Sequence, residues 1–270
     1  MSLSDFSHFA RSILDELFQK PEFTLKEPIK AVPLTRNYQT LGAGFDYALR
    51  ILVSKLNANI VNAFPLTARG GIKGDKRRLQ FIEDFEEKRT QFARGDVSIS
   101  CLLADCIILA KLEAVARTGN NFPNSQIFDV DERDVEDLLN LMELVNPRDF
   151  KANHTCVLNP VFGKSSLDVG GADADIIIDS TLIDIKTTKY LKFTREYFRQ
   201  LIGYYILNKR ERFPYGVIDH LGIYYARFGM LFTFQVPPII EDVWRNKETG
   251  EELASWKVVE EAIKDYKAND

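Results

Sequence analysis

The stretch "GGADADIIIDSTLIDIKTTK", residues 170–189, is the most informative part of the chain because charged side chains interrupt two apolar segments within it. The segments 171–179 and 181–187 are rich in isoleucine and have the length of strands. Asp179 and Ser180 lie between them, and such a pair is typical of a tight turn. We therefore expect two neighbouring antiparallel strands.

Three charged side chains are expected to meet at one end of this hairpin. Side chains two residues apart on a strand point to the same face, so Asp184 and Lys186 share a face. The short turn brings Asp175, which opens the first strand, close to them. Two neighbouring carboxylates repel each other unless a cation joins them. Mg²⁺ prefers oxygen ligands, and the backbone carbonyl of Ile185 can supply another one.

This set of groups suits the hydrolysis of a phosphodiester. A metal ion held by Asp175 and Asp184 polarises the phosphate and lowers the pKa of an attacking water. Lys186 then orients that water or stabilises the negative charge that develops on the phosphate. We predict these three as catalytic residues, with Mg²⁺ as cofactor and Mn²⁺ as a substitute.

The chain before residue 150 is expected to be mainly helical. Asp75 is predicted to cap one of its helices, and Gly95 and Gly119 are predicted to end two of them. Apolar residues at helical spacing predict helices at 4–19, 40–64, 73–95, 98–119 and 131–147.

The pattern changes after residue 150. Residues 154–163 form a further strand candidate, and Thr194 is the predicted cap of a helix at 193–212. Residues 219–236 predict a hairpin that turns near Arg227–Gly229, and 255–267 predict a final helix.

These elements predict an α/β protein without a flexible linker. We expect one compound domain over residues 1–270. Its parts are a helical region at 1–150, a core at 151–240 and a helical tail at 241–270.

Composition narrows the classes of function. The net charge of −4 means that any nucleic-acid binding must use a local basic patch. The three cysteines form no CxxC pair, so neither a disulfide framework nor a zinc ribbon is indicated. The N-terminus does not resemble a signal peptide, and no apolar run approaches the length of a membrane span. We expect a cytoplasmic protein with no membrane partner.

The two-strand motif resembles the signature of the PD-(D/E)xK nuclease superfamily. In that signature an acid opens one core strand and a (D/E)xK triplet lies on the next. The resemblance assigns the first acid to Asp175 and the triplet to Asp184-Ile185-Lys186. Ala174 replaces the proline of the signature, and Asp173 is a rival for the first acid. The implied fold is a restriction-endonuclease-like core, a mixed central sheet flanked by helices, with a large helical N-terminal elaboration.

The following helix carries a second motif, since Gln200 and Tyr204 are four residues apart and share a helical face. This spacing is similar to the Gln-xxx-Tyr motif of the RecB-like branch. The resemblance implies that both side chains shape the active site and contact DNA. Lys189 and Arg199 lie nearby in the sequence, and we predict that they bind substrate phosphates.

An upstream acid is expected to complete the metal site. RecB-like domains often open with Gly-xxx-His, and "GAGFD" at 42–46 is a comparable helix entry with Asp46 in place of the histidine. Glu113 is the alternative, because a glutamate in an apolar helix needs a partner.

The resemblance implies a Mg²⁺-dependent nuclease that hydrolyses DNA phosphodiesters, with RNA left open as a substrate and the choice between exonuclease and endonuclease undecided. A non-catalytic nucleic-acid-binding or partner-docking module on the same fold is the alternative. The chain has no GxxxxGK[ST] motif, so a helicase partner would be a separate chain.

Overall fold

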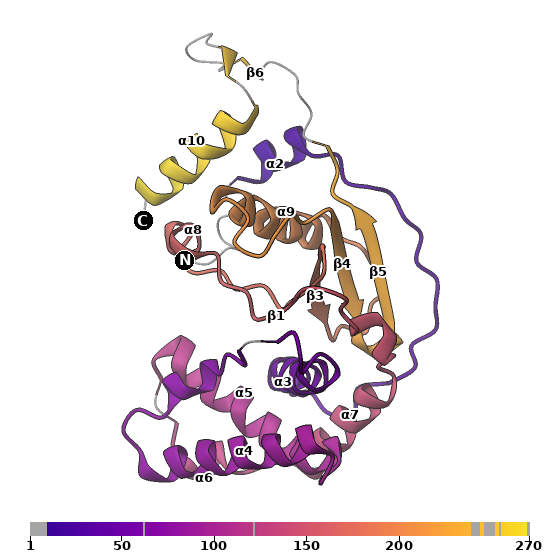
Figure 1. Cartoon of the computed structure of the whole chain (residues 1–270), viewed down its shortest axis with the longest axis vertical. Coiled ribbons are helices and arrows are strands. Elements are labelled where there is room, and N and C mark those ends of the chain that lie inside the picture. The colour runs from indigo at the N-terminus through magenta and orange to yellow at the C-terminus, as the bar shows by residue number, and fades with distance from the viewer. Residues whose placement is uncertain are drawn as a thin grey trace.

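The chain folds as an α/β protein in which a mixed five-stranded sheet lies between helices (Figure 1). The prediction of an α/β protein with a large helical N-terminal region is confirmed. The computed structural model describes residues 10–61, 63–120, 122–238, 244–245, 252–253 and 255–268.

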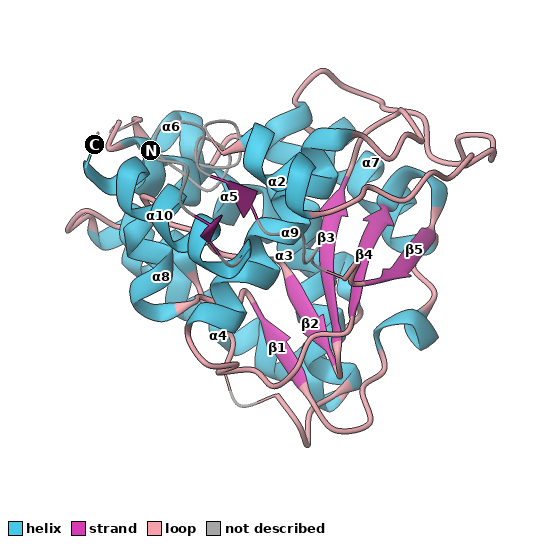
Figure 2. Ribbon diagram, turned by 90° about the horizontal axis from the view of Figure 1, so that it is seen from above, coloured by secondary structure: helices cyan, strands magenta, loops and turns pink. Residues whose placement is uncertain are grey.

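The strands follow the order β1-β2-β3-β4-β5 across the sheet (Figure 2). β1, β2 and β3 are antiparallel neighbours, whereas β4 runs parallel to β3. Helix α9, Arg195–Arg210, makes the crossover that a parallel pair requires. The strands are Cys156–Leu158 (β1), Ile176–Ile178 (β2), Thr181–Lys186 (β3), His220–Tyr225 (β4) and Met230–Gln235 (β5).

The N-terminal helices cover one face of the sheet, where α3 lies directly against the strands (Figure 1). The predicted caps are confirmed: the Asp75 carboxylate accepts the Arg77 amide at 2.8 Å, and Gly95 and Gly119 end their helices with positive φ. The helices are Tyr38–Leu56 (α3), Lys76–Arg94 (α4), Leu103–Thr118 (α5), Asn124–Ile127 (α6) and Glu132–Glu143 (α7).

The other face of the sheet is covered by α9, with α2, α8 and α10 packed around it (Figure 1). Thr194 caps α9 as predicted, because its hydroxyl accepts the Tyr197 amide at 3.2 Å. The remaining helices are Arg11–Leu17 (α2), Gly163–Asp168 (α8) and Ser255–Ala268 (α10).

Strand alternation divides the core into two clusters, one on each face. Ile176 and Ile178 pack toward α3, and Ile177 packs toward α9. On β3, Ile183 faces α3 and Leu182 faces α9. Each fully buried side chain of this size contributes about 1.5–3 kcal/mol relative to an exposed one. A slip of one residue would exchange the two faces, so this burial sets the register that positions the charged residues.

Two predicted strands are shorter than expected. Regular pairing of the strand predicted at 154–163 is confined to Cys156–Leu158, because Asn159 has a positive φ of 50° and Pro160 has no amide hydrogen to donate. The chain then forms α8, a helix that the pattern did not predict. The strand predicted at 171–179 pairs regularly only at Ile176–Ile178, with one isolated bridge between Val161 and Asp173.

Other boundaries also differ. The helix predicted at 40–64 is α3, which ends at Leu56, and the segment before α7, where no helix was predicted, contains the short helix α6. Of the helix predicted at 4–19, residues 1–9 lie outside the described part. The tail is not only helical, since Trp244–Arg245 (β6) and Glu252–Leu253 (β7) pair as antiparallel strands.

The hairpin predicted at 219–236 is confirmed. β4 and β5 pair in antiparallel register, and the chain reverses at Ala226–Phe228 and Gly229. No helix in the described part of the chain combines the length and the apolar character needed to cross a membrane.

Candidate active site

The β2–β3 pairing brings Asp175 to the predicted position. Ile176 lies opposite Ile183, so one further step of this register sets Asp175 opposite Asp184. The Ile185 amide donates a hydrogen bond of 2.5 Å to Asp175 Oδ2. This bond fixes the Asp175 carboxylate at the end of β2, next to the triplet on β3.

Lys186 connects the triplet to α9. Its ammonium lies 2.8 Å from Asp184 Oδ2 and donates to Gln200 Oε1 at 2.9 Å. The Gln200 amide in turn donates to the Tyr204 hydroxyl at 3.1 Å. Gln200 and Tyr204 meet because residues four apart share a helical face. The strand triplet and the helix motif are therefore joined in one continuous network of polar contacts.

The two candidate upstream acids differ in how they are paired. Glu113 is satisfied, because it accepts the Tyr47 hydroxyl at 2.5 Å and the Arg117 guanidinium at 2.7 Å. Asp46 uses Oδ2 for an ion pair with Arg50, while its Oδ1 is buried without a hydrogen-bond partner. A buried, unpaired carboxylate oxygen is costly unless a ligand completes it. The structure therefore favours Asp46 over Glu113 as the acid with an available oxygen.

Arg117 was not singled out from the sequence. It lies on α5, half-exposed, and its Nη2 contacts Asp173 Oδ2 at 2.8 Å in addition to the Glu113 pair. Arg117 and Asp173 are 56 residues apart, so no local pattern could have found this contact. The arrangement leaves Asp173, the rival first acid, paired with a cation.

These groups line a cavity of about 320 Å³, which we call the acid cavity. Asp184 and Lys186 are not among its lining residues; Asp184 is 3% exposed and lies with Lys186 on the α9 face of β3. Asp175 thus joins the buried ion pair to the cavity. The lining residues are Gly42, Ala43, Asp46, Glu113, Arg117, Asn159, Asp173, Asp175, Ile185, Thr187 and Tyr204.

Burial and neighbouring charges shift the pKa values of Asp175, Asp46 and Lys186. Burial raises the pKa of Asp175 well above its usual range, and the nearby charges of Asp184 and Asp46 raise it further. Burial also raises the pKa of Asp46, although the Arg50 charge opposes this shift. Burial alone would lower the pKa of Lys186, but the charge and hydrogen bond of Asp184 together with the charge of Asp175 outweigh it and the pKa is raised. Lys186 is therefore an ammonium at neutral pH.

The donor set fits a hard divalent cation by its chemistry. Oxygen ligands are available from Asp175, Asp46 and the Ile185 carbonyl, and the orphaned Asp46 Oδ1 is the observation that carries this fit. Within the described residues, no three His, Cys, Asp or Glu side chains converge as a ready-made metal cage. Mg²⁺ does not require one, because it keeps several waters and binds through one or two carboxylates plus substrate phosphate.

The two predicted phosphate-binding residues lie outside the acid cavity. Arg199 makes a bidentate contact with Asp15 of α2, at 3.0 Å and 2.5 Å. Lys189 is exposed beyond the end of β3, with its ammonium 5.2 Å from the centre of the Tyr190 ring.

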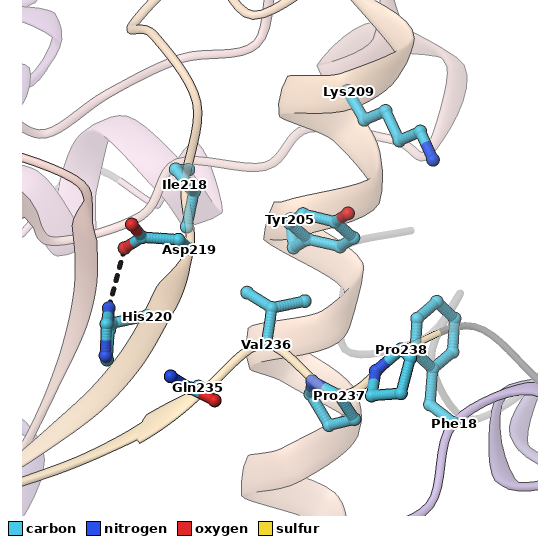
Figure 3. Close-up of a pocket in the computed structure, with 10 residues that line it drawn as sticks. All are labelled: Phe18, Tyr205, Lys209, Ile218, Asp219, His220, Gln235, Val236, Pro237 and Pro238. Carbon is cyan, nitrogen blue, oxygen red and sulfur yellow. Dashed lines mark hydrogen bonds and ion pairs between the residues drawn. The ribbon is translucent and has the colours of Figure 1, made fainter.

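A larger cavity, about 800 Å³, lies at the other end of the sheet, where β4 begins (Figure 3). The His220 ring pairs with Asp219 at 2.6 Å there, and α9 contributes Tyr205 and Lys209 to the wall. His220 pairs with Thr181, at the start of β3, so this cavity is separated from Lys186 by the length of that strand. None of the predicted site residues lines it.

Comparisons of the chain with protein-family models, with curated proteins and with solved structures gave no match.

Proposed function

We propose that the protein is a Mg²⁺-dependent nuclease of the PD-(D/E)xK type, with a restriction-endonuclease-like core, that hydrolyses DNA phosphodiester bonds. The strand order supports this proposal, since three antiparallel strands are followed by a helix and a strand parallel to the third. The acid directly precedes the second of these strands and the triplet lies on the third, an arrangement that agrees with the resemblance.

One observation supports the proposal most directly. The carboxylate of Asp175 interacts electrostatically with the Asp184–Lys186 pair on the neighbouring strand and also with Asp46 of α3, which is distant in sequence and lines the same cavity. Buried like charges are destabilising, so such a cluster is expected where function requires it. A purely structural sheet end has no use for it.

The residues have distinct roles in this proposal. When bound, the divalent cation supplies Lewis acidity toward the phosphate and lowers the pKa of water. Asp175 and Asp46 would hold it, with the Ile185 carbonyl and Asp184. Lys186 is charged rather than a free base, so it stabilises the phosphate charge and orients the water instead of removing its proton.

The remaining polar residues position this group. Gln200 holds the Lys186 ammonium, and Tyr204 supports Gln200 while also lining the acid cavity. Arg117 is half-exposed at the same cavity and can exchange its carboxylate partners for a substrate phosphate, for which its planar fork is well suited.

A non-catalytic module remains the second candidate, and one observation favours it. The described residues hold no preformed group of three metal-ligating side chains. A binding module would contact nucleic acid or a protein partner without a metal requirement.

The test compares the purified chain with Asp184→Asn and Lys186→Met on labelled single-stranded DNA, duplex DNA and RNA. Each substrate is incubated with Mg²⁺, Mn²⁺ or EDTA. Asp84→Asn is the matched control, because Asp84 is an exposed acid on α4. We expect metal-dependent cleavage that falls by about 100-fold or more with Lys186→Met, the range for loss of one charge-stabilising donor.

Cleavage that persists in both variants would refute the proposed catalytic roles of Asp184 and Lys186. No cleavage by the wild-type chain, together with metal-independent nucleic-acid binding, would instead favour the binding module.

A further inference from the structure

A second pocket lies directly beside the acid cavity, with a volume of about 280 Å³. Thr187, the first residue after β3, lines both spaces. We call it the tyrosine pocket. Its lining residues are Pro33, Tyr38, Thr187, Thr188, Lys189, Tyr190 and Arg227.

Two aromatic rings at this pocket are largely exposed to solvent. Tyr38 is 53% exposed and Tyr190 is 59% exposed, although both lie at a pocket where burial is available. They come from different elements, because Tyr38 begins α3 and Tyr190 follows β3. Aromatic rings of this kind offer flat faces on which another planar group can stack.

The base of the tyrosine pocket is rigid. Arg227 is 1% exposed, donates to the Thr187 carbonyl at 3.0 Å and holds both carboxylate oxygens of Asp137. The Tyr190 amide donates to the Thr188 hydroxyl oxygen at 3.1 Å, which turns the chain after β3. The pocket wall is thus held in place by a buried ion pair and a local turn.

The chemistry of the tyrosine pocket matches a nucleotide. Stacking on an aromatic side chain is the common, sequence-tolerant way in which proteins hold an unpaired base. Lys189, exposed beside the Tyr190 ring, provides a cation for the adjoining phosphate. A base inside a duplex has no free face, and freeing it costs a few kcal/mol.

We infer that the tyrosine pocket binds an unpaired nucleobase of a single-stranded nucleic acid and so delivers a single strand, in preference to a duplex, to the acid cavity. The inference rests on the proposed nuclease function, because continuity with the acid cavity identifies the occupant. It explains why Lys189 lies outside the acid cavity but still close to its rim.

Binding is measured first, in EDTA, so that no cleavage is needed. The probes are single-stranded DNA and RNA dodecamers containing 2-aminopurine, whose fluorescence falls on stacking, and a blunt DNA hairpin. The variants are Tyr190→Ala, Tyr38→Ala and Tyr190→Phe, which keeps the ring. Phe122→Ala is the matched control, because Phe122 is 40% exposed and lines neither space.

We expect each alanine variant to weaken single-strand binding by about 5- to 150-fold, the value of one stacked base. Tyr190→Phe and Phe122→Ala should keep wild-type affinity, and hairpin binding should not change. The DNA and RNA arms show which backbone is preferred. The inference would be overturned if both alanine variants kept wild-type affinity for the single strand, as expected for a pocket that holds a partner's side chain. Equal losses of affinity for the single strand and for the hairpin would also overturn it.

Cleavage is measured second, as the ratio of rates on single-stranded and duplex DNA with Mn²⁺. A ratio that falls with Tyr190→Ala supports the inference. Cleavage by wild type with an unchanged ratio overturns the inference alone. Ring-dependent binding without any cleavage overturns the nuclease proposal alone.

Discussion

Replacement of Asp175 by asparagine should make the protein more stable and less able to bind metal. Carboxylates opposite each other on neighbouring strands have Cβ atoms about 5 Å apart. Two unit charges at that separation repel by about 3 kcal/mol at an effective dielectric constant of about 20. Lys186 and the Ile185 amide offset part of this repulsion. We therefore expect Asp175→Asn to raise the free energy of unfolding by about 1–2 kcal/mol near pH 7.5 without metal.

The difference in stability between the wild type and Asp175→Asn should depend on pH. The folded-state pKa of Asp175 is raised, so the folded chain binds a proton more tightly than the unfolded chain does. The stability of the wild type therefore falls as pH rises through the raised pKa, whereas Asp175→Asn lacks this loss. The difference between the two proteins should shrink as pH is lowered toward the ordinary carboxyl pKa. An asparagine oxygen can still accept the Ile185 amide, so the hydrogen bond is kept.

Urea unfolding in EDTA at several pH values measures this difference. Asp173→Asn is the matched control, because that acid faces the same cavity but is paired with Arg117. Its loss removes one partly exposed ion pair, so stability should change by at most about 1 kcal/mol. Mn²⁺ should raise the melting temperature of the wild type more than that of Asp175→Asn. A destabilised Asp175→Asn at pH 7.5 in EDTA would refute the reasoning.

Two further substitutions test the packing that supports the site. Arg227→Met should cost about 3–5 kcal/mol of unfolding free energy, because Asp137 is fully buried and would lose its cation. The double variant Arg227→Met/Asp137→Leu should recover part of that loss. A cost of the single variant below about 1 kcal/mol, measured by urea unfolding, would contradict the buried ion pair between Arg227 and Asp137. Gly71→Ala should cost about 1–3 kcal/mol of unfolding free energy, since its new Cβ would lie 2.1 Å from the Leu112 carbonyl oxygen. The control Gly44→Ala would have ordinary contacts at 3.6 Å and should be neutral or stabilising. Equal melting temperatures for the two variants would argue against the close approach of Gly71 to Leu112.

Local signals in the sequence predicted the elements that depend on local forces. Asp75 and Thr194 cap their helices because a short side chain can reach the free amides of the first turn wherever that turn forms. The hairpin at 219–236 follows from two apolar runs around Gly229. The length of β1 and the helix α8 were missed, since Asn159 and Pro160 end the strand early through a backbone conformation that apolar patterning does not report.

In the candidate site, too, some features follow from the sequence and others are decided only by the tertiary structure. Alternation along one strand and the short turn after Ile178 determine from sequence alone that Asp184 and Lys186 share a face with Asp175 nearby. Only the tertiary structure distinguishes Asp46 from Glu113, because the distinction depends on whether Tyr47 and Arg117 satisfy the carboxylate. It alone also brings Arg117 to Asp173 and joins the tyrosine pocket to the acid cavity at Thr187. The physical reason is range: side-chain periodicity acts over a few residues, whereas ion pairing and desolvation depend on which distant elements the core packs together.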